Sequence, residues 1–310
     1  MDKKKIIFRQ IWRSRFTYLF ILPGIIYFLL FYYSPMYGLL MAFKNYNARL
    51  GILNSEWVGL TYFQRLFITP LAVKSIFNTL KISVCRLILE FPVPIIIAIL
   101  LNEMRGKRLN RIYQTAFTLP HFLSWVIVST ILKNFFANSG AVNYLLQSAG
   151  IEKINFLSSP NVFFGMIFLT ANWKEAGWSA IIYLAAISGI NPELYEAAIV
   201  DGASRFRRIW HITLPSIKSV ITILFILAIG NAMNGGFDQI FNMRNPVVTD
   251  ISNIIDTYVY DITFLAVPNY GFSTAVGMFK SIINSILLLC ANFIALKVIG
   301  QGLFGVRRVK

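Results

Sequence analysis

Long runs of apolar residues, separated by short polar stretches, dominate the chain. Several of these runs exceed the roughly 18 apolar residues that indicate a membrane-spanning helix. The runs are also far longer than the strands of a membrane barrel, and a helix satisfies its own backbone hydrogen bonds in lipid. The pattern therefore predicts an all-α polytopic membrane protein with six transmembrane helices, at residues 16–42, 75–101, 114–136, 161–189, 216–242 and 275–299.

Composition favours a membrane protein over a soluble one. Hydrophobic residues make up 56% of the 310 residues and charged residues 14%, whereas a soluble domain has about 25% charged residues. Cys85 and Cys290 fall in predicted spans, so we interpret both as packing residues and not as a disulfide pair. The apolar run at 16–42 follows a basic start, as in a signal peptide. It is too long and lacks a small-residue cleavage site, so we expect it to be retained.

The formal net charge of +16 raises the question of a nucleic-acid partner. The distribution of charge argues against one, because the basic residues gather in clusters that flank the spans. In a six-span chain all four clusters lie on one side, and basic loops stay in the cytoplasm. We therefore predict that both termini are cytoplasmic and that no nucleic acid binds. The clusters comprise Lys3, Lys4, Lys5, Arg9, Arg13 and Arg15; Arg105, Lys107, Arg108 and Arg111; Arg205, Arg207 and Arg208; and Arg307, Arg308 and Lys310.

Motifs for several kinds of chemistry are missing from the sequence. His121 and His211 have no metal-ligand spacing to another His or to a Cys pair, which argues against an intramembrane metalloprotease. No glycine-rich loop ending in Lys-Ser or Lys-Thr is present, so any ATP that drives this chain is bound by another polypeptide. No selectivity-filter run is evident, which weakens a channel interpretation. We expect no metal, no cofactor and no catalytic residue in this chain.

The segment between the fourth and fifth spans has an ordered set of interruptions. Asn191-Pro192-Glu193 predicts a helix start, because Asn caps, Pro tolerates the first helical position and Glu faces the positive end of the helix dipole. Asp201-Gly202 predicts a sharp turn. A second short helix is predicted over residues 203–213, before Leu214-Pro215 leads into the next span. By composition alone, the segment is instead a solvated loop whose arginines only set the topology.

The same segment resembles a known motif. The sequence EAAIVDGASRFRRIWHITLP, residues 196–215, is similar to the EAA loop of ABC-importer permeases in its Glu-Ala-Ala start, its glycine and its Ile-x-Leu-Pro end. Three further stretches resemble the carbohydrate-importer permeases related to the maltose permease, especially the oligosaccharide branch. They are LPGIIYFLLFYYSPMYGLLMAFKNYN near the start, RIYQTAFTLPHFLSWVIV at residues 111–128 and YLAAISGINPELYEAAIVDGA at residues 183–203.

This resemblance implies that the chain is one subunit of a binding-protein-dependent importer in the cytoplasmic membrane of a bacterium. Two permeases, identical or paralogous, form the pore, two ATPases carrying ATP and Mg²⁺ bind beneath it, and an extracellular solute-binding protein delivers an oligosaccharide. The domain plan is a cytoplasmic segment at 1–15, a permease domain at 16–300 with its EAA loop at 191–215, and a cytoplasmic tail at 301–310. The residues expected in the coupling helix that docks on an ATPase are Glu196, Ala197, Ala198, Asp201, Gly202 and Ala203.

Polar and aromatic side chains inside the spans indicate where a sugar passes, because hydroxyl groups bond to amides and carboxylates while sugar rings contact aromatic rings. A structural alternative is that the aromatic residues form membrane belts and the amides join helices. Lys81, Arg86 and Glu90 are a weaker case, and we predict that Arg86 and Glu90 form a structural ion pair at i,i+4 spacing. The candidate path residues are Asn172, Trp173, Lys174, Trp178 and Tyr183 in the fourth span, with Glu175 beside them; Asn231, Asn234, Phe237, Asp238 and Gln239 in the fifth; and Lys280 and Asn284 in the sixth.

The favoured function is therefore ATP-coupled uptake of an oligosaccharide. Import of amino acids or another solute by the same kind of complex is one alternative. A channel or a stand-alone secondary transporter is another, and uptake that persists without any ATPase would favour it. An intramembrane enzyme is a more distant alternative, because the sequence has no convincing catalytic constellation.

Overall fold

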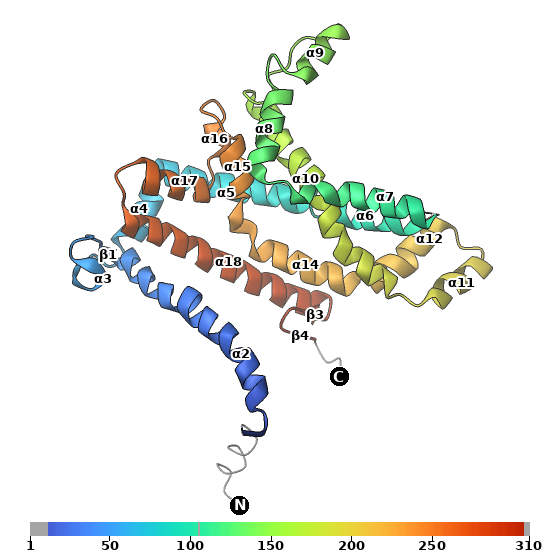
Figure 1. Ribbon diagram of the computed structural model, residues 1–310, viewed down its shortest axis with the longest axis horizontal. Coiled ribbons are helices and arrows are strands. Elements are labelled where there is room, and N and C mark those ends of the chain that lie inside the picture. The colour runs from blue at the N-terminus through green and yellow to red at the C-terminus, as the bar shows by residue number, and fades with distance from the viewer. Residues whose placement is uncertain (1–11, 105, 307–310) are drawn as a thin grey trace, which may run out of the picture.

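The computed structural model describes residues 12–104 and 106–306, and its regular structure is almost entirely helical (Figure 1). The longer helices are α2 (Arg15–Phe28), α5 (Pro70–Leu89), α6 (Pro92–Glu103), α7 (Lys107–Thr118), α8 (Trp125–Phe135), α10 (Pro160–Ser188), α14 (Lys218–Gly230) and α18 (Tyr270–Val298). The shorter segments are η1 (Leu29–Tyr33), η2 (Ser34–Phe43), α3 (Gly51–Asn54), α4 (Thr61–Ile68), η3 (Leu119–Phe122), α9 (Ala141–Ser148), α11 (Pro192–Val200), α12 (Arg205–Arg208), η4 (Ile209–Thr213), α13 (Leu214–Ser216), η5 (Ala232–Asn234), α15 (Phe237–Met243), α16 (Thr249–Ser252), α17 (Ile255–Tyr260) and η6 (Asp261–Leu265). Strands β1 (Lys44–Asn45) and β2 (Glu56–Trp57) form one short antiparallel pair, and β3 (Gln301–Gly302) and β4 (Gly305–Val306) form another.

Three segments form helices that are long and apolar enough to cross a membrane: Arg15–Phe43, Pro70–Glu103 and Tyr270–Val298. They match the first, second and sixth predicted spans. If each of two bent pairs of helices counts as one span, the described residues contain at most five candidate membrane-spanning segments. The fourth predicted span forms the single helix α10, but Lys174 and Glu175 near its centre make it more polar. The all-α membrane fold is thus confirmed, whereas the count of six spans stays a prediction.

The third predicted span, residues 114–136, is not one straight helix. α7 and η3 run up to a bend of 99°, and α8 leaves it in a new direction. Pro120 lacks the backbone N–H that would continue the helical ladder. Ser124 then caps α8, because its hydroxyl accepts a hydrogen bond from the backbone N–H of Ile127 at 3.3 Å. The hydrophobic run predicted a span but did not reveal this bend, which we call the elbow (residues 119–124).

The fifth predicted span, residues 216–242, is also broken. A bend of 63° separates α13 from α14. The chain turns again after α14, where Gly235 and Gly236 have φ values of +47° and +84°. Glycine adopts such left-handed conformations readily because it has no Cβ. The prediction of one continuous helix was wrong here, because α14 ends at Gly230 and the Gly-Gly pair after η5 lets α15 begin in a new direction.

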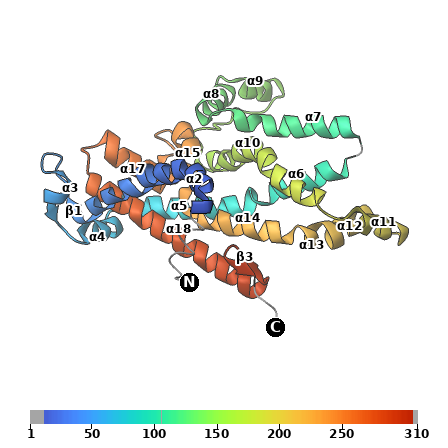
Figure 2. The same ribbon diagram turned by 60° about the horizontal axis from the view of Figure 1, so that its bottom comes forward.

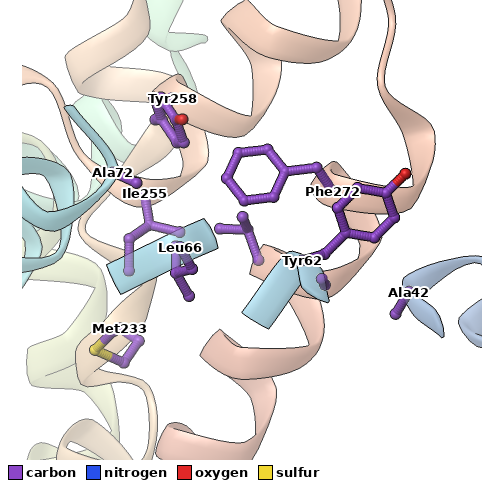
Figure 3. Packing of buried hydrophobic residues seen from close by; sticks show 10 residues of the cluster. Ala42, Tyr62, Leu66, Ala72, Met233, Ile255, Tyr258 and Phe272 are labelled. Atoms are coloured by element: carbon purple, nitrogen blue, oxygen red, sulfur yellow. The ribbon is translucent and has the colours of Figure 1, made fainter. Parts of the chain in front are cut away.

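The hydrophobic core joins helices that are distant in the sequence. α10 packs against α6 and α7, with small residues at the contact as is typical of membrane helices. At the other end of the molecule, the side chains of Tyr62, Leu66, Ile255 and Phe272 lie together and join α4, α17 and α18 (Figure 3). Leu66 in this cluster is fully buried. These contacts hold the helices around the hollows described below.

Three parts of the chain extend away from this core (Figure 1). α2 leaves the body as a long helix, and within the described chain none of its residues is buried. α8 and α9 project from another side. α11 and α12 lie beyond the ends of α10 and α14, which is visible in both views (Figures 1 and 2). The molecule therefore exposes several surfaces that can meet lipid or other subunits.

The two ends of the chain are only partly described. Residues 301–306 form a hairpin that packs on α14 and α18, where Oδ1 of Asn292 accepts a hydrogen bond from the backbone N–H of Leu303 at 2.7 Å. The start of the predicted tail at 301–310 is therefore part of the folded body. The predicted basic residues that lie outside the described residues are Lys3, Lys4, Lys5, Arg9, Arg105, Arg307, Arg308 and Lys310.

Candidate functional site

A cavity of about 360 Å³ lies where α5, α6, α10 and α14 meet the loop at residues 231–236. Its walls combine apolar side chains with a small number of polar groups, as in most small-molecule sites. The lining residues are Ser83, Arg86, Leu87, Glu90, Phe91, Pro94, Ala171, Asn172, Glu175, Ala176, Ser179, Ile182, Tyr183, Leu224, Ala228, Asn231, Ala232, Asn234, Gly235 and Gly236.

Arg86 is the cation among these lining residues. Its Nη1 lies 3.1 Å from Oε2 of Glu90, and its Nη2 lies 2.5 Å from Oε1 of Gln239. The predicted i,i+4 ion pair between Arg86 and Glu90 is therefore confirmed. Gly236 lets the guanidinium group approach the loop, because a Cβ at that position would lie only 2.4 Å from Nη2. The pair is thus fixed by α15 and the loop as well as by its own helix.

Three buried polar atoms of lining residues have no hydrogen-bond partner within the described chain: Nε of Arg86, Oε1 of Glu90 and Oδ1 of Asn172. One of them is a donor and two are acceptors. Buried polar groups are nearly always paired, and leaving one unpaired costs about 1–3 kcal/mol. The side chains that carry these atoms also line the cavity, and guanidinium, carboxylate and amide groups are all suited to hydrogen bonds with hydroxyl groups.

Five of the residues named for the path line this cavity: Asn172, Glu175, Tyr183, Asn231 and Asn234. A second, more open groove is lined by Asn234 together with Phe237 and Lys280. The structure thus brings predicted residues from three different spans to two adjoining hollows that share Asn234. Whether these side chains contact a transported molecule stays a prediction.

The other six predicted path residues are not among those that line either hollow. Gln239 is buried, and its amide donates to the backbone of Ile167 at 2.6 Å. Asn284 accepts a hydrogen bond from the backbone N–H of Met233 at 2.9 Å. These two amides join helices, as the structural alternative expects. The six residues are Trp173, Lys174, Trp178, Asp238, Gln239 and Asn284.

Lys174 and Trp178 instead hold the elbow against α10. The ring of Trp178 stacks on His121, with a centroid distance of 4.5 Å and an interplanar angle of 4°. Nδ1 of His121 lies 2.6 Å from Glu175, and Nζ of Lys174 lies 2.7 Å from Glu175 and 2.9 Å from the backbone oxygen of His121. Because Glu175 also lines the cavity, this cluster fixes one of its walls. The described residues contain no cluster of His, Cys, Asp and Glu suited to a metal ion.

The predicted helix–turn–helix is present at residues 191–213. Asn191 caps α11 with its side chain, which accepts a backbone hydrogen bond at 3.1 Å. The chain turns at Gly202, whose φ value is +73°. The hydroxyl of Tyr195 lies 2.9 Å from that of Thr213 and ties α11 to the following helix. The local chain direction is therefore set by a cap, a turn and one side-chain contact.

The surface of α11 is open. None of its residues is buried within the part of the chain that the structure describes. Leu194, Ile199 and Val200 are exposed although they are apolar. Of the predicted coupling residues, Glu196, Ala197, Asp201 and Gly202 are exposed, and Ala198 and Ala203 are half-buried.

A family model described as "Binding-protein-dependent transport system inner membrane component" matches residues 90–300. The chain belongs to this family. The match includes the elbow, α10, α11 and most of the cavity wall. This inner-membrane component is therefore a multi-pass protein that serves transport.

Curated relatives and solved structures resemble the inner-membrane component over nearly its whole length. Protein LplB of Bacillus subtilis (strain 168) is 46% identical, with 94% of this chain and 92% of LplB covered. The polygalacturonan/rhamnogalacturonan transport system permease protein YteP of the same organism is 45% identical, with 98% and 94% covered. A chain of a bacterial ABC transporter involved in the import of the acidic polysaccharide alginate is 36% identical and superposes with a TM-score of 0.87, with 94% and 99% covered.

Sequence reasoning missed part of the cavity wall of this component. It treated Arg86 and Glu90 only as a weaker case for the path, favouring a structural ion pair, and did not select Ser83 or Phe91. A signal was present for three of these residues, because Ser83, Arg86 and Glu90 follow one another at spacings of three and four, which places them on one helical face. Polar and aromatic side chains on one face of an apolar segment indicate a hollow or a partner rather than lipid.

Proposed function

We propose that this chain is the permease subunit of an ABC importer that carries an oligosaccharide into the cell. The observation that carries this proposal is the cavity itself, which is lined by the polar side chains of Arg86, Glu90 and Asn172. Hydroxyl groups of a sugar both donate and accept, so they can pair with guanidinium, carboxylate and amide groups. Phe91 and Tyr183 line the same cavity and offer aromatic surface to the apolar faces of sugar rings.

The relatives support a carbohydrate over another solute. YteP is named for the transport of polygalacturonan and rhamnogalacturonan. One solved neighbour was crystallised with an alginate pentasaccharide-bound periplasmic protein, and it has a TM-score of 0.87 with 36% identity. By analogy, an extracellular solute-binding protein delivers the oligosaccharide to this chain.

Energy for uptake comes from two separate ATPase subunits, which bind ATP and Mg²⁺, while this chain holds no cofactor and no catalytic residue. α11 is the coupling helix in this proposal, because none of its residues is buried within the described chain and it projects beyond the ends of α10 and α14 (Figure 2). Glu196, Ala197, Ala198, Asp201, Gly202 and Ala203 contact an ATPase. Closure of the ATPases then moves α11 and switches access to the cavity between the two sides of the membrane.

The complete transporter contains a second permease subunit, a paralogue or a second copy of this chain. Six spans place both termini and α11 in the bacterial cytoplasm. The positive-inside rule supports this orientation, because Arg205, Arg207 and Arg208 lie beside α11.

The test is uptake by proteoliposomes that contain the complete transporter and its binding protein. Asn231→Leu removes an amide that lines the cavity, and we expect it to raise the sugar concentration needed for half-maximal uptake. A net hydrogen bond contributes about 0.5–1.5 kcal/mol, which corresponds to about two- to tenfold. Asn242→Leu is the matched control. Both amides donate to the carbonyl four residues earlier, at 3.0 and 2.7 Å, but Asn242 is not among the residues lining either hollow.

Three results would contradict the proposal. Uptake that continues without the ATPases would identify a channel or a secondary transporter. Uptake of amino acids but of no oligosaccharide would identify another substrate class. Equal effects of Asn231→Leu and Asn242→Leu on the half-saturating sugar concentration would show that the cavity is not part of the transport path.

A further inference from the structure

A second hollow of about 480 Å³ opens beside the cavity, between α15, α17, η6 and α18. Phe237, Tyr260 and Phe264 supply aromatic rings to it, and Asp256 and Lys280 supply charges. Asn234 lines both this groove and the cavity. The groove and the cavity therefore adjoin at Asn234, in the loop at residues 231–236.

The aromatic rings of the groove form a row. The ring centroids of Phe237 and Tyr260 are 6.1 Å apart, and those of Tyr260 and Phe264 are 5.1 Å apart. Phe264 is 69% exposed, so the end of the row faces outward. A row of rings at these intervals offers successive apolar surfaces to an extended molecule.

Contacts between α15 and η6 hold the row of rings in place. Arg244 bonds to both carboxylate oxygens of Asp261, at 2.8 and 2.7 Å, and this pair joins α15 to η6. The guanidinium of Arg244 also lies over the ring of Phe241, 5.1 Å from its centroid. The ring of Phe241 in turn lies 4.6 Å from that of Tyr260. The groove is thus preformed, which lowers the entropic cost of binding a ligand.

The polar side chains of the groove distinguish it from a lipid-facing surface. Nζ of Lys280 lies 2.6 Å from Oδ1 of Asp256, and both side chains are largely buried. An acyl chain offers no partner to this ion pair or to the amide of Asn234. A sugar chain offers hydroxyl groups to these polar side chains and apolar ring faces to the aromatic row.

We propose that the groove is a second glycan subsite, in which sugar units contact Phe237, Tyr260 and Phe264 while their hydroxyl groups bond to Asp256 and Lys280. This inference rests on the proposed function and extends it to the length of the substrate. One molecule reaches from the cavity past Asn234 into the groove, so the transported glycan contains more sugar units than the cavity alone holds. The groove then contributes to the affinity for long oligosaccharides but not for short ones.

The experiment measures uptake of two size ladders, oligogalacturonides and manno-oligosaccharides, each from two to six sugar units, by the reconstituted transporter. Phe264→Ala should raise the half-saturating concentration of the longest members about three- to tenfold, since one aromatic contact contributes about 0.5–1.5 kcal/mol. Phe264→Ala should leave the half-saturating concentration of the disaccharide unchanged. Phe264→Tyr keeps a ring and should restore wild-type behaviour. Phe304→Ala is the matched control, because Phe304 is also exposed, at 65%, but lies in the C-terminal hairpin.

Each other outcome overturns the inference. Unchanged uptake at all lengths, or an equal loss at all lengths, would show that the groove binds no sugar; the proposed function would still stand if uptake required ATP. Loss of the second permease from purified Phe264→Ala transporter would show that the groove is a subunit interface. A wild-type transporter that takes up neither ladder would overturn this inference together with the proposed function.

Discussion

Gly177 and Gly165 lie on the same helix, α10, but have different surroundings. A Cβ built on Gly177 would lie 2.1 Å from the backbone oxygen of Phe117 on α7. A Cβ built on Gly165 would meet no atom of the described chain within 4 Å. Gly177 therefore sets how closely α7, and with it the elbow, approaches α10.

Gly177→Ala should destabilise the folded chain by about 1–3 kcal/mol, because the backbone of Phe117 must shift to make room. Gly165→Ala should have little effect or stabilise slightly, since alanine favours a helix over glycine. The measurement is the free energy of unfolding of each purified variant in detergent, by denaturant titration. Equal values for the two variants would mean that α7 and α10 do not pack as described.

At the scale of elements, α11 and α9 end in the same way. After α11, the backbone N–H of Ala203 bonds to the oxygen of Ala198 at 2.8 Å and Gly202 has a φ value of +73°. After α9, the N–H of Ile151 bonds to the oxygen of Leu146 at 2.9 Å and Gly150 has a φ value of +76°. Both are glycine caps of one type.

Gly202→Ala and Gly150→Ala should each introduce roughly 1–2 kcal/mol of local backbone strain, because alanine disfavours the left-handed region. Steric crowding does not distinguish the two positions, since a Cβ at either one meets nothing within 4 Å in the described chain. If α11 couples to an ATPase, only Gly202→Ala should lower sugar-stimulated ATP hydrolysis, by about fivefold or more if the strain falls on the docked state. If Gly202→Ala shows normal sugar-stimulated ATP hydrolysis with the ATPases bound, this turn does not couple the chain to the ATPases.

At the scale of the whole molecule, the orientation in the membrane follows from the basic clusters. Reporter fusions at residue 310 and within 203–208 should report the cytoplasm, and a fusion within 245–255 should report the exterior, because basic loops are retained inside. The side of the membrane on which each fusion lies is measured by comparing the activity of a cytoplasm-specific reporter with that of a periplasm-specific reporter at the same position. The reverse pattern, or both sets of fusions on one side, would contradict a six-span chain with cytoplasmic termini.

The sequence by itself determined the features that depend on neighbouring residues. Apolar runs determined that the chain is a helical membrane protein, because hydropathy acts over one helix length. Asn191 and Gly202 determined the ends of α11, because a cap and a left-handed turn are local. The spacing of Arg86 and Glu90 determined their ion pair. The motif at residues 196–215 indicated a transport family that the comparisons confirm.

Only the tertiary structure decided which side chains face a common hollow. Arg86 and Gln239 meet although 153 positions separate them, and Lys174 reaches back to the elbow at His121. The 99° bend at the elbow and the Gly-Gly turn at residues 235–236 redirect helices that the hydrophobic pattern predicts to continue. Hydropathy records how apolar a segment is but not which face meets which helix. The division of polar residues into those that line the cavity and those that join helices therefore depends on packing between distant segments.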